Sequence, residues 1–178
     1  MKRFAHTLAA AAGFAFALSA QAAPVLSYNG HDYYYSSPAS DWATAEAQAQ
    51  GMGGHLVAIN DAAEQAALLG AFGRTETLWI GLTDAASEGT FAWTNGDALT
   101  FTNWAGGEPN NSGNEDVVAM NWGANGAWND LPNGGCCTNP LTALRGIIEV
   151  TSPVPEPGSL ALAGLALAGL WVGTRRRA

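Results

Sequence analysis

The sequence predicts an α+β fold in which helices come first and short strands follow. Two stretches near the start place apolar residues at helical spacing, whereas the chain after residue 77 alternates short apolar runs with polar, glycine-rich loops. Helical patterns that precede strand patterns, rather than alternating with them, favour α+β over a parallel α/β sheet. With both termini set aside, the remaining chain has the size of one ordinary domain.

The first elements are a hairpin and a helix. Tyrosines cluster in the run from Val25 to Tyr35 around Asn29-Gly30, a pattern typical of two short strands joined by a turn. Ser40 is expected to cap a helix that continues to about Gln50. One face of this helix carries Trp42, Ala45 and Ala49.

A second helix and several strands follow. Asp61 and Glu64 form a pattern like a capping box, and Gly73 is expected to end the helix. His55 stands alone beside apolar neighbours, which favours a structural histidine over a metal ligand. Strands are predicted at Leu78 to Leu82, Phe91 to Trp93, Leu99 to Phe101, Val117 to Asn121 and Arg145 to Val150.

The segment from Trp104 to Asp130 concentrates oxygen-bearing side chains in loops. Glu108-Pro109-Asn110, Glu115-Asp116 and Trp128-Asn129-Asp130 lie within it, and few basic residues are present to neutralise them. A hard cation would balance this charge. Calcium accepts six to eight oxygen ligands in irregular geometry, whereas magnesium requires a stricter octahedron. The segment therefore predicts a calcium site.

These motifs resemble those of C-type lectin-like domains. The order Glu-Pro-Asn, Glu-Asp and Trp-Asn-Asp resembles the family's sugar-binding members, and Trp79-Ile80-Gly81-Leu82 resembles its core strand. The likeness covers about Tyr28 to Val150. It implies that Pro109 follows a cis peptide bond and that the first and last strands pair, with Tyr33 to Tyr35 beside Ile147 to Glu149.

The resemblance also implies a ligand set for a principal calcium ion that holds the sugar. Two neighbouring hydroxyls of a hexose would complete its coordination, while the same carboxylates accept, and the amides donate, hydrogen bonds to those hydroxyls. The order of acid and amide around the proline is the family's pattern for mannose-, glucose- or fucose-type sugars. The expected residues are Glu108, Asn110, Glu115, Asn129 and Asp130.

A second, auxiliary calcium ion is implied by further matches to the family. One position departs from the pattern, because Asn111 stands where the family usually has Asp, and the lost charge should weaken this ion. The residues expected around it are Asp84, Glu88, Asn111, Glu115 and Asp116.

The family's usual disulfides are expected to be absent. Ala49, Val117 and Ile148 stand where cysteines are expected, so apolar packing has to replace the roughly 2 to 4 kcal/mol that a disulfide typically contributes. The only cysteines are the adjacent Cys136 and Cys137. A vicinal disulfide, an intermolecular link and free thiols all stay open for this pair.

Both termini have the pattern of processing signals. Residues 1–22 have the basic start, apolar run and small residues of a signal peptide, which leaves residues 23–150 as the lectin-like domain. Residues 151–178 form a linker and a segment resembling a PEP-CTERM sorting signal, which in that family is removed by an exosortase during export through a Gram-negative envelope. Its apolar run from Leu160 to Val172 would insert transiently in the inner membrane, and a permanent anchor is the alternative.

Charge and motifs exclude several functions. Between residues 23 and 154 lie 14 acidic residues and two arginines, a net charge of −12, which excludes a nucleic-acid surface. The sequence has no nucleophile motif, phosphate loop or zinc-type histidine cluster, so it is not expected to be an enzyme. The main interpretation is calcium-dependent glycan binding at the cell surface or in an exopolysaccharide matrix. The alternative is a structural or adhesive matrix module that binds protein and uses calcium only to order its loops.

Overall fold

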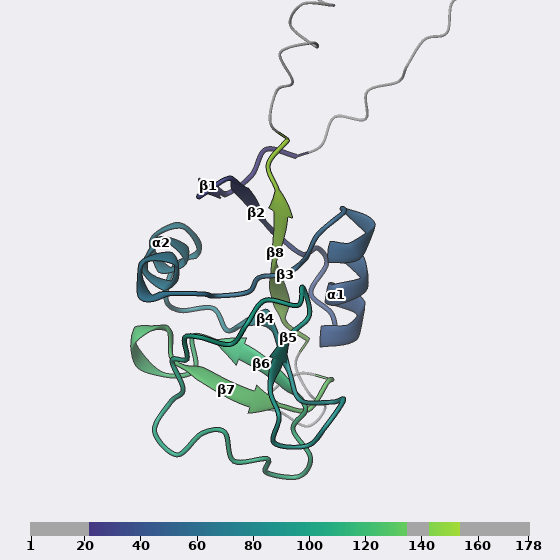
Figure 1. The fold of residues 1–178 in the computed structure, drawn as a ribbon, viewed down its shortest axis with the longest axis vertical. Coiled ribbons are helices and arrows are strands. Elements are labelled where there is room, and N and C mark those ends of the chain that lie inside the picture. Colours follow the sequence, from purple (N-terminus) through teal and green to yellow (C-terminus); the bar gives the residue numbers. More distant parts are fainter. Residues whose placement is uncertain (1–21, 135–142, 154–178) are drawn as a thin grey trace, which may run out of the picture.

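The computed structural model describes residues 22–134 and 143–153. In chain order the elements are β1 (Leu26–Tyr28), β2 (His31–Tyr35), α1 (Trp42–Gly51), β3 (His55–Leu56), α2 (Ala62–Phe72), β4 (Leu78–Thr83), β5 (Ala92–Trp93), β6 (Val117–Met120), the 3₁₀ turn η1 (Ala124–Gly126), β7 (Trp128–Leu131) and β8 (Arg145–Thr151). The α+β prediction is confirmed (Figure 1).

The expected signal peptide, both cysteines and the apolar C-terminal run lie outside the described residues. Among the residues that the structure does describe, none of the helices has the length and apolar character needed to cross a bilayer.

The described strands form one sheet in the order β1-β2-β8-β4-β6-β7, with β3 paired to β8 and β5 to β4. All pairs are antiparallel except β4 with β8. The first and last strands pair as expected, with Tyr33 opposite Glu149, Tyr34 opposite Ile148 and Tyr35 opposite Ile147. This pairing brings the two ends of the domain together at one end of the molecule (Figure 1).

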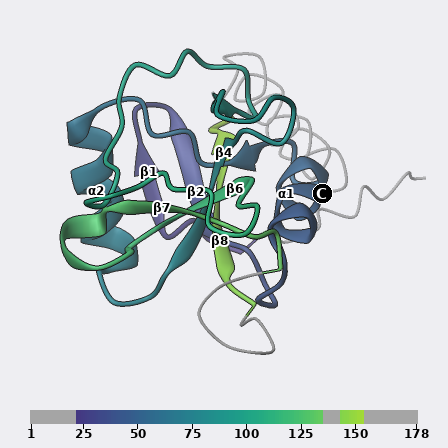
Figure 2. The same cartoon turned by 90° about the horizontal axis from the view of Figure 1, so that it is seen from below.

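The helices lie on opposite sides of the central strands (Figure 2). On one side, α2 contributes Leu68, Leu69 and Phe72 to a core that also holds Ile80 and Trp128. On the other side, α1 packs Ala45 and Ala49 against Leu56, Trp79 and Ile148. Each helix thus covers one face of the sheet, so apolar residues of both strand faces are buried.

Apolar packing occupies the positions where the family usually has cysteines. Ala49 and Ile148 are fully buried in the same cluster, and Val117 is buried with them. The expectation that packing replaces cross-links at these positions is confirmed.

Helix capping differs from the prediction at one end. Asp41, not Ser40, is the N-cap of α1, and its carboxylate accepts the Thr44 N–H at 2.7 Å. Ser40 is unavailable because its backbone forms an isolated bridge with Leu144. For α2 the prediction holds: Asp61 accepts the N–H groups of Ala63 and Glu64, and Gly73 ends the helix with φ +83°.

Two strand assignments were wrong or missing. The segment from Leu99 to Phe101 is not a strand; Phe101 instead packs edge-on against Trp128 at 5.7 Å between ring centroids. The Trp-Asn-Asp motif, expected in a loop, lies in β7 and pairs with β6. Burial explains β7, because Trp128 is fully buried and donates its indole N–H to Gln65 at 2.9 Å.

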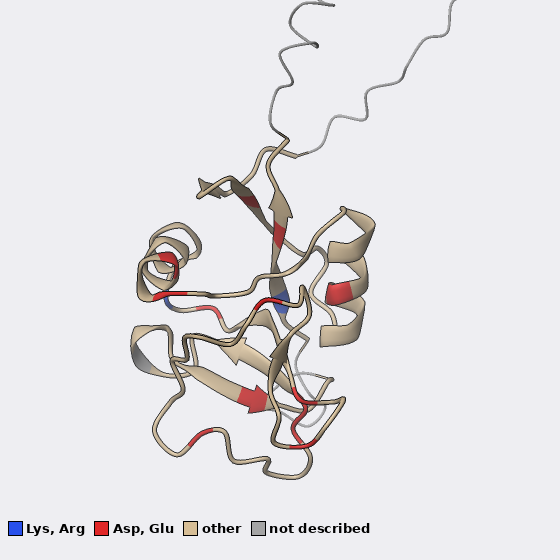
Figure 3. Cartoon of the chain, viewed as in Figure 1, with Lys and Arg blue, Asp and Glu red and all other residues tan. Residues whose placement is uncertain are grey.

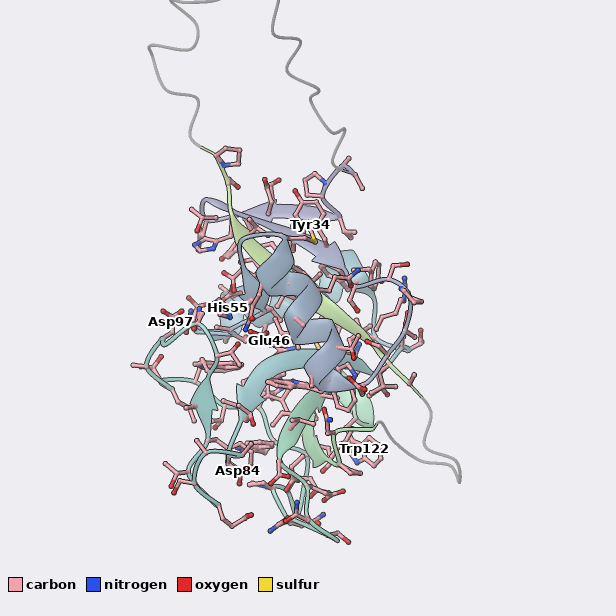
Figure 4. The ribbon with its side chains drawn as sticks, turned by 90° about the vertical axis from the view of Figure 1, so that its right-hand side faces the viewer. Tyr34, Glu46, His55, Asp84, Asp97 and Trp122 are labelled. Atoms are coloured by element: carbon pink, nitrogen blue, oxygen red, sulfur yellow. The ribbon has the colours of Figure 1, made fainter. Side chains whose placement is uncertain are left out.

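His55 has the expected structural role. Its Nδ1 lies 2.6 Å from Glu46 Oε1, and Glu46 Oε2 accepts the N–H of the fully buried Leu56 at 2.8 Å. Glu46 and His55 lie side by side between α1 and β3 (Figure 4). This polar pair attaches helix α1 to the start of strand β3.

Candidate functional site

The principal candidate residues come from one long loop and one strand. Glu108, Asn110 and Glu115 lie between β5 and β6, while Asn129 and Asp130 lie in β7. Because β6 and β7 are antiparallel, Asp130 stands opposite Val118, three residues after Glu115. The sheet therefore brings the end of the loop next to the Asn-Asp pair. The Glu108–Pro109 peptide bond is cis, as the resemblance implies.

Asp130 holds the turn that follows the proline. Its Oδ1 accepts the Asn110 N–H at 3.2 Å, and its Oδ2 accepts the Asn111 N–H at 2.8 Å. The carboxylate is 1% exposed. A buried carboxylate with backbone donors on both oxygens fixes the position of the loop relative to β7.

Further hydrogen bonds order the same loop. Asn110 donates its amide to Glu108 Oε2. Glu115 Oε2 accepts the Ser112 N–H at 2.9 Å, and the Glu115 N–H donates to Asn111 Oδ1 at 2.7 Å. Glu108, Asn110, Glu115 and Asp130 thus lie in one connected network. Their hydrogen-bond partners within the described residues are loop amides rather than basic side chains.

Asn129 supplies a buried oxygen that lacks a donor. The residue is 3% exposed, and its Oδ1 has no hydrogen-bond partner within the described residues. Buried polar atoms are almost always paired, so an orphaned oxygen beside several carboxylates indicates a place for a cation or a polar ligand.

The carboxylates of the loop affect one another electrostatically. Burial, followed by the nearby charge of Asp130, raises the pKa of Glu108. Burial also raises the pKa of Glu115, to which the charges of Asp130 and Glu108 add. Acidic residues are numerous at the lower end of the molecule, whereas the described basic residues lie elsewhere (Figure 3). The arrangement concentrates negative charge without a protein cation in contact with it.

The auxiliary candidates lie beside the principal group. Asp84 is 2% exposed, its N–H donates to the Asp116 carbonyl at 3.2 Å, and its Oδ1 has no partner within the described residues. Asn111 donates its amide to Glu88 Oε1 at 2.7 Å. Burial raises the pKa of Glu88, and the charges of Asp84 and Asp116 raise it further. Asp84 lies toward the same end as the long loop (Figure 4).

One small hollow joins the two groups. Asp84 and Glu88 line it from one side, Asn111 and Asp130 from the other, and Phe91 and Pro109 supply apolar walls. The auxiliary and principal candidates are therefore neighbours in space, although 46 residues separate Asp84 from Asp130.

The donor set fits a hard cation in composition. In the part of the chain that the structure describes, no three His, Cys, Asp or Glu side chains form a ready metal-binding cluster. The candidate groups instead mix carboxylates with amides, and several of their oxygens accept hydrogen bonds from the loop. Oxygen-only donors, including the orphaned Asn129 Oδ1 and Asp84 Oδ1, are the type that calcium prefers.

A second polar hollow was not anticipated from the sequence. It lies by the β1–β2 hairpin and is lined by Asn29, His31, Tyr33, Asn60, Asp61, Glu64, Asn95, Asp97 and Glu149. Its buried carboxylates have protein partners. Tyr33 donates to Glu64 at 2.7 Å, and His31 Nδ1 lies 2.8 Å from Glu149. The sequence gives no signal for this hollow because its residues come from distant segments.

Comparison with known proteins identifies the family. The Lectin C-type domain model matches residues 39–143. The chain belongs to the C-type lectin domain family. The PEP-CTERM protein-sorting motif matches residues 153–177, so the second resemblance is also confirmed. Members of the C-type lectin family are binding proteins rather than enzymes, in agreement with the expectation for this chain.

Individual C-type lectins are similar over most of the domain. The human protein "C-type lectin domain family 17, member A" is 40% identical over 106 residues, which cover 60% of this chain and 28% of that protein. The "Alpha-N-acetylgalactosamine-specific lectin" of Patiria pectinifera is 40% identical over 116 residues, covering 58% of this chain and 68% of the lectin.

Solved structures agree with the family assignment. The cow CD23 carbohydrate-recognition domain, crystallised in the presence of GlcNAc2Man3 oligosaccharide, has a TM-score of 0.62 at 28% identity, covering 71% of this chain and 92% of that domain. The calcium-independent type II antifreeze protein has a TM-score of 0.63 at 23% identity, which shows the shared fold alone.

Proposed function

We propose that this chain is a calcium-dependent lectin for mannose-, glucose- or fucose-type glycans. The observation that carries the proposal is the convergence of Glu108, Asn110, Glu115 and Asp130 on the orphaned oxygen of Asn129. When bound there, calcium would offer unfilled coordination positions to two neighbouring sugar hydroxyls.

The chain's own residues would orient the sugar. The carboxylates of Glu108 and Glu115 accept protons from hydroxyl groups, and the amides of Asn110 and Asn129 donate to hydroxyl oxygens. Asp130 keeps the loop in place through the N–H groups of Asn110 and Asn111. Each sugar hydroxyl would then meet a donor or an acceptor, which favours a pair of hydroxyls with one fixed geometry.

The order of groups around Pro109 supports the sugar class. The acid precedes the proline and the amide follows it, which in the resembling lectins goes with mannose-like rather than galactose-like sugars. Several similar proteins have names or titles that mention carbohydrate, including the cow and starfish proteins described above. The calcium-independent relative makes the metal dependence a matter for direct test.

We further propose that Asp84, Glu88, Asn111, Glu115 and Asp116 hold an auxiliary calcium ion. Support comes from the orphaned Asp84 Oδ1 and from the hollow shared with Asp130. Asn111 carries no charge, and its amide already bonds Glu88, so this ion should bind more weakly than the principal one.

Export completes the proposal. The PEP-CTERM motif supports processing by an exosortase-type enzyme, with residues 1–22 removed as a signal peptide and the C-terminal segment held transiently in the inner membrane. The lectin domain would then reach the cell surface or an extracellular matrix, where a polysaccharide with many identical units compensates for weak binding of each one.

Isothermal titration calorimetry on the mature chain tests the proposal. Methyl mannoside should bind in calcium and not in chelator, whereas Asp32→Asn, which removes a carboxylate on β2 away from the site, should bind like the wild type. Equal binding with and without calcium would reject the calcium mechanism. Binding of calcium without any sugar would favour the matrix module instead.

A further inference from the structure

The folded domain extends to the residue at which the sorting motif begins. Strand β8 pairs with β2 as far as Thr151, which lies opposite His31. The next residue, Ser152, donates its N–H to the Gly30 carbonyl at 2.8 Å. The sorting motif match starts at residue 153. The motif therefore follows directly on the last hydrogen-bonded residue of the domain.

This adjacency makes the tether short. Eight residues, Pro153 to Leu160, lead from Ser152 to the start of the apolar run. Fully extended, they reach about 26–29 Å. The polar headgroup layer takes up about 5–7 Å of that length. A domain held by the inserted apolar run thus hangs within about 25 Å of the membrane surface.

The domain is larger than the reach of its tether. A folded chain of this length has a radius of gyration of about 14 Å, which corresponds to a sphere about 36 Å across. To turn the domain over, the tether would have to run along its whole length before entering the membrane. A reach of about 25 Å is insufficient for that path.

The tether leaves from the end opposite the candidate site. Both ends of the described chain emerge beside the β1–β2 hairpin, whereas β7 and the long loops lie at the other end (Figure 1). The side view agrees, with Tyr34 of β2 toward one end and Asp84 toward the other (Figure 4). The short tether therefore attaches the hairpin end, not the site end, to the sorting segment.

We propose that, while the C-terminal segment is in the membrane, the β1–β2 hairpin end faces that membrane and the candidate calcium and sugar site points away from it. The inference rests on the membrane step of the proposed function and extends it. It makes the unprocessed chain competent to meet a large glycan before release. Processing then frees the domain without being needed to expose its site.

Site-specific labelling of the full chain tests this orientation. In a background with Cys136→Ser and Cys137→Ser, single cysteines are introduced as Ser27→Cys on the hairpin or Ala85→Cys near the site, both at exposed positions. The chain is expressed without the processing enzyme, and a bulky polymer-conjugated maleimide is added to spheroplasts. Labelling of Ser27→Cys should be several-fold slower than labelling of Ala85→Cys.

A linker variant is the matched control. Insertion of about 20 Gly and Ser residues between Ser152 and Pro153 gives the tether a reach well beyond the domain's diameter. Labelling of Ser27→Cys should then rise to the Ala85→Cys rate. Equal rates at both positions in the chain without the insertion would overturn the proposed orientation.

The assay separates this inference from the sugar-binding proposal. Alkaline extraction reports whether the chain is held in the membrane, and a chain released by it would overturn the orientation together with the membrane step. Sugar binding is not measured, so failure of the lectin proposal would leave the labelling pattern unchanged.

Discussion

Asp130 Oδ2 accepts the Asn111 N–H at 2.8 Å, which joins strand β7 to the loop that follows Pro109. The contact links two candidate ligand groups, because Asp130 belongs to the principal set and Asn111 to the auxiliary set. It also places a fully buried carboxylate where its charge is stabilised by backbone donors rather than by a basic residue.

Replacing Asp130 with Asn should therefore weaken calcium binding. The substitution keeps the shape of the side chain but removes one charge, and ligand charge is a main determinant of calcium affinity. We expect calcium affinity to fall by at least about tenfold in calorimetric titration. The control is Asp32→Asn, which removes the same charge from β2. Unchanged affinity in the Asp130 variant would exclude this carboxylate as a ligand.

Exchanging the groups around Pro109 should change the sugar preference. In Glu108→Gln with Asn110→Asp, the acid and the amide swap places, so donors and acceptors toward the two hydroxyls are reversed. We expect the ratio of mannose to galactose affinity to fall by roughly tenfold, about 1.4 kcal/mol. Competition binding against an immobilised mannan measures this ratio. An unchanged ratio would assign the choice of sugar to neighbouring loops.

Glu46→Ala should destabilise the fold without affecting ligand binding. The change leaves the fully buried Leu56 N–H without its acceptor and His55 without its partner. An unsatisfied buried donor costs about 1–3 kcal/mol. We expect thermal unfolding to shift down by about 4–10 °C. The matched control is Gln50→Ala on the exposed side of α1, and an equal shift there would show that helix propensity, not the buried pair, is responsible.

A cross-link between Ala49 and Ile148 should stabilise the domain only when oxidised. Both residues are fully buried in one cluster, and the disulfide would close a loop of about 100 residues, worth up to about 4.7 kcal/mol in the chain-entropy estimate. The loss of Ile148 side-chain volume costs about 1–3 kcal/mol.

The test uses Ala49→Cys with Ile148→Cys in a background lacking Cys136 and Cys137. Denaturant unfolding should give a more stable protein than the background when oxidised and a less stable one when reduced. Stability below the background in both states would mean that α1 and β8 do not hold the two positions in disulfide geometry.

Glu149 should lower stability as the pH rises from mildly acidic to neutral. Burial raises the pKa of this carboxyl above its ordinary value. Between the ordinary pKa and the raised folded-state pKa, the unfolded chain loses the proton while the folded chain keeps it, so unfolding becomes easier with increasing pH. Below the ordinary pKa this contribution is fully present.

The measurement compares unfolding free energies of the wild type and Glu149→Gln across this pH range. The wild type should become less stable relative to the variant as the pH rises, because Gln does not titrate. Asp32→Asn supplies a titrating control on the neighbouring strand. A pH-independent difference between wild type and Glu149→Gln would contradict the raised pKa.

Much of the fold follows from local sequence patterns. Asp61 with Glu64 and Gly73 marks both ends of α2, because capping groups act on the adjacent turn and need no distant partner. Asn29-Gly30 marks the first hairpin for the same reason. The family motif likewise indicates the candidate ligands, since their residue types and order are properties of the chain itself.

Tertiary packing decided what local pattern could not. The Asn129-Asp130 pair has the composition of a turn, yet it lies in a buried strand because Trp128 fills the core and β6 offers a partner. The shared hollow of Asp84, Asn111 and Asp130, and the contact between His31 and Glu149, join segments far apart in sequence. Such contacts depend on how strands are ordered in the sheet, so the sequence determined the ligand types and helix ends, while the three-dimensional fold determined which of these groups meet.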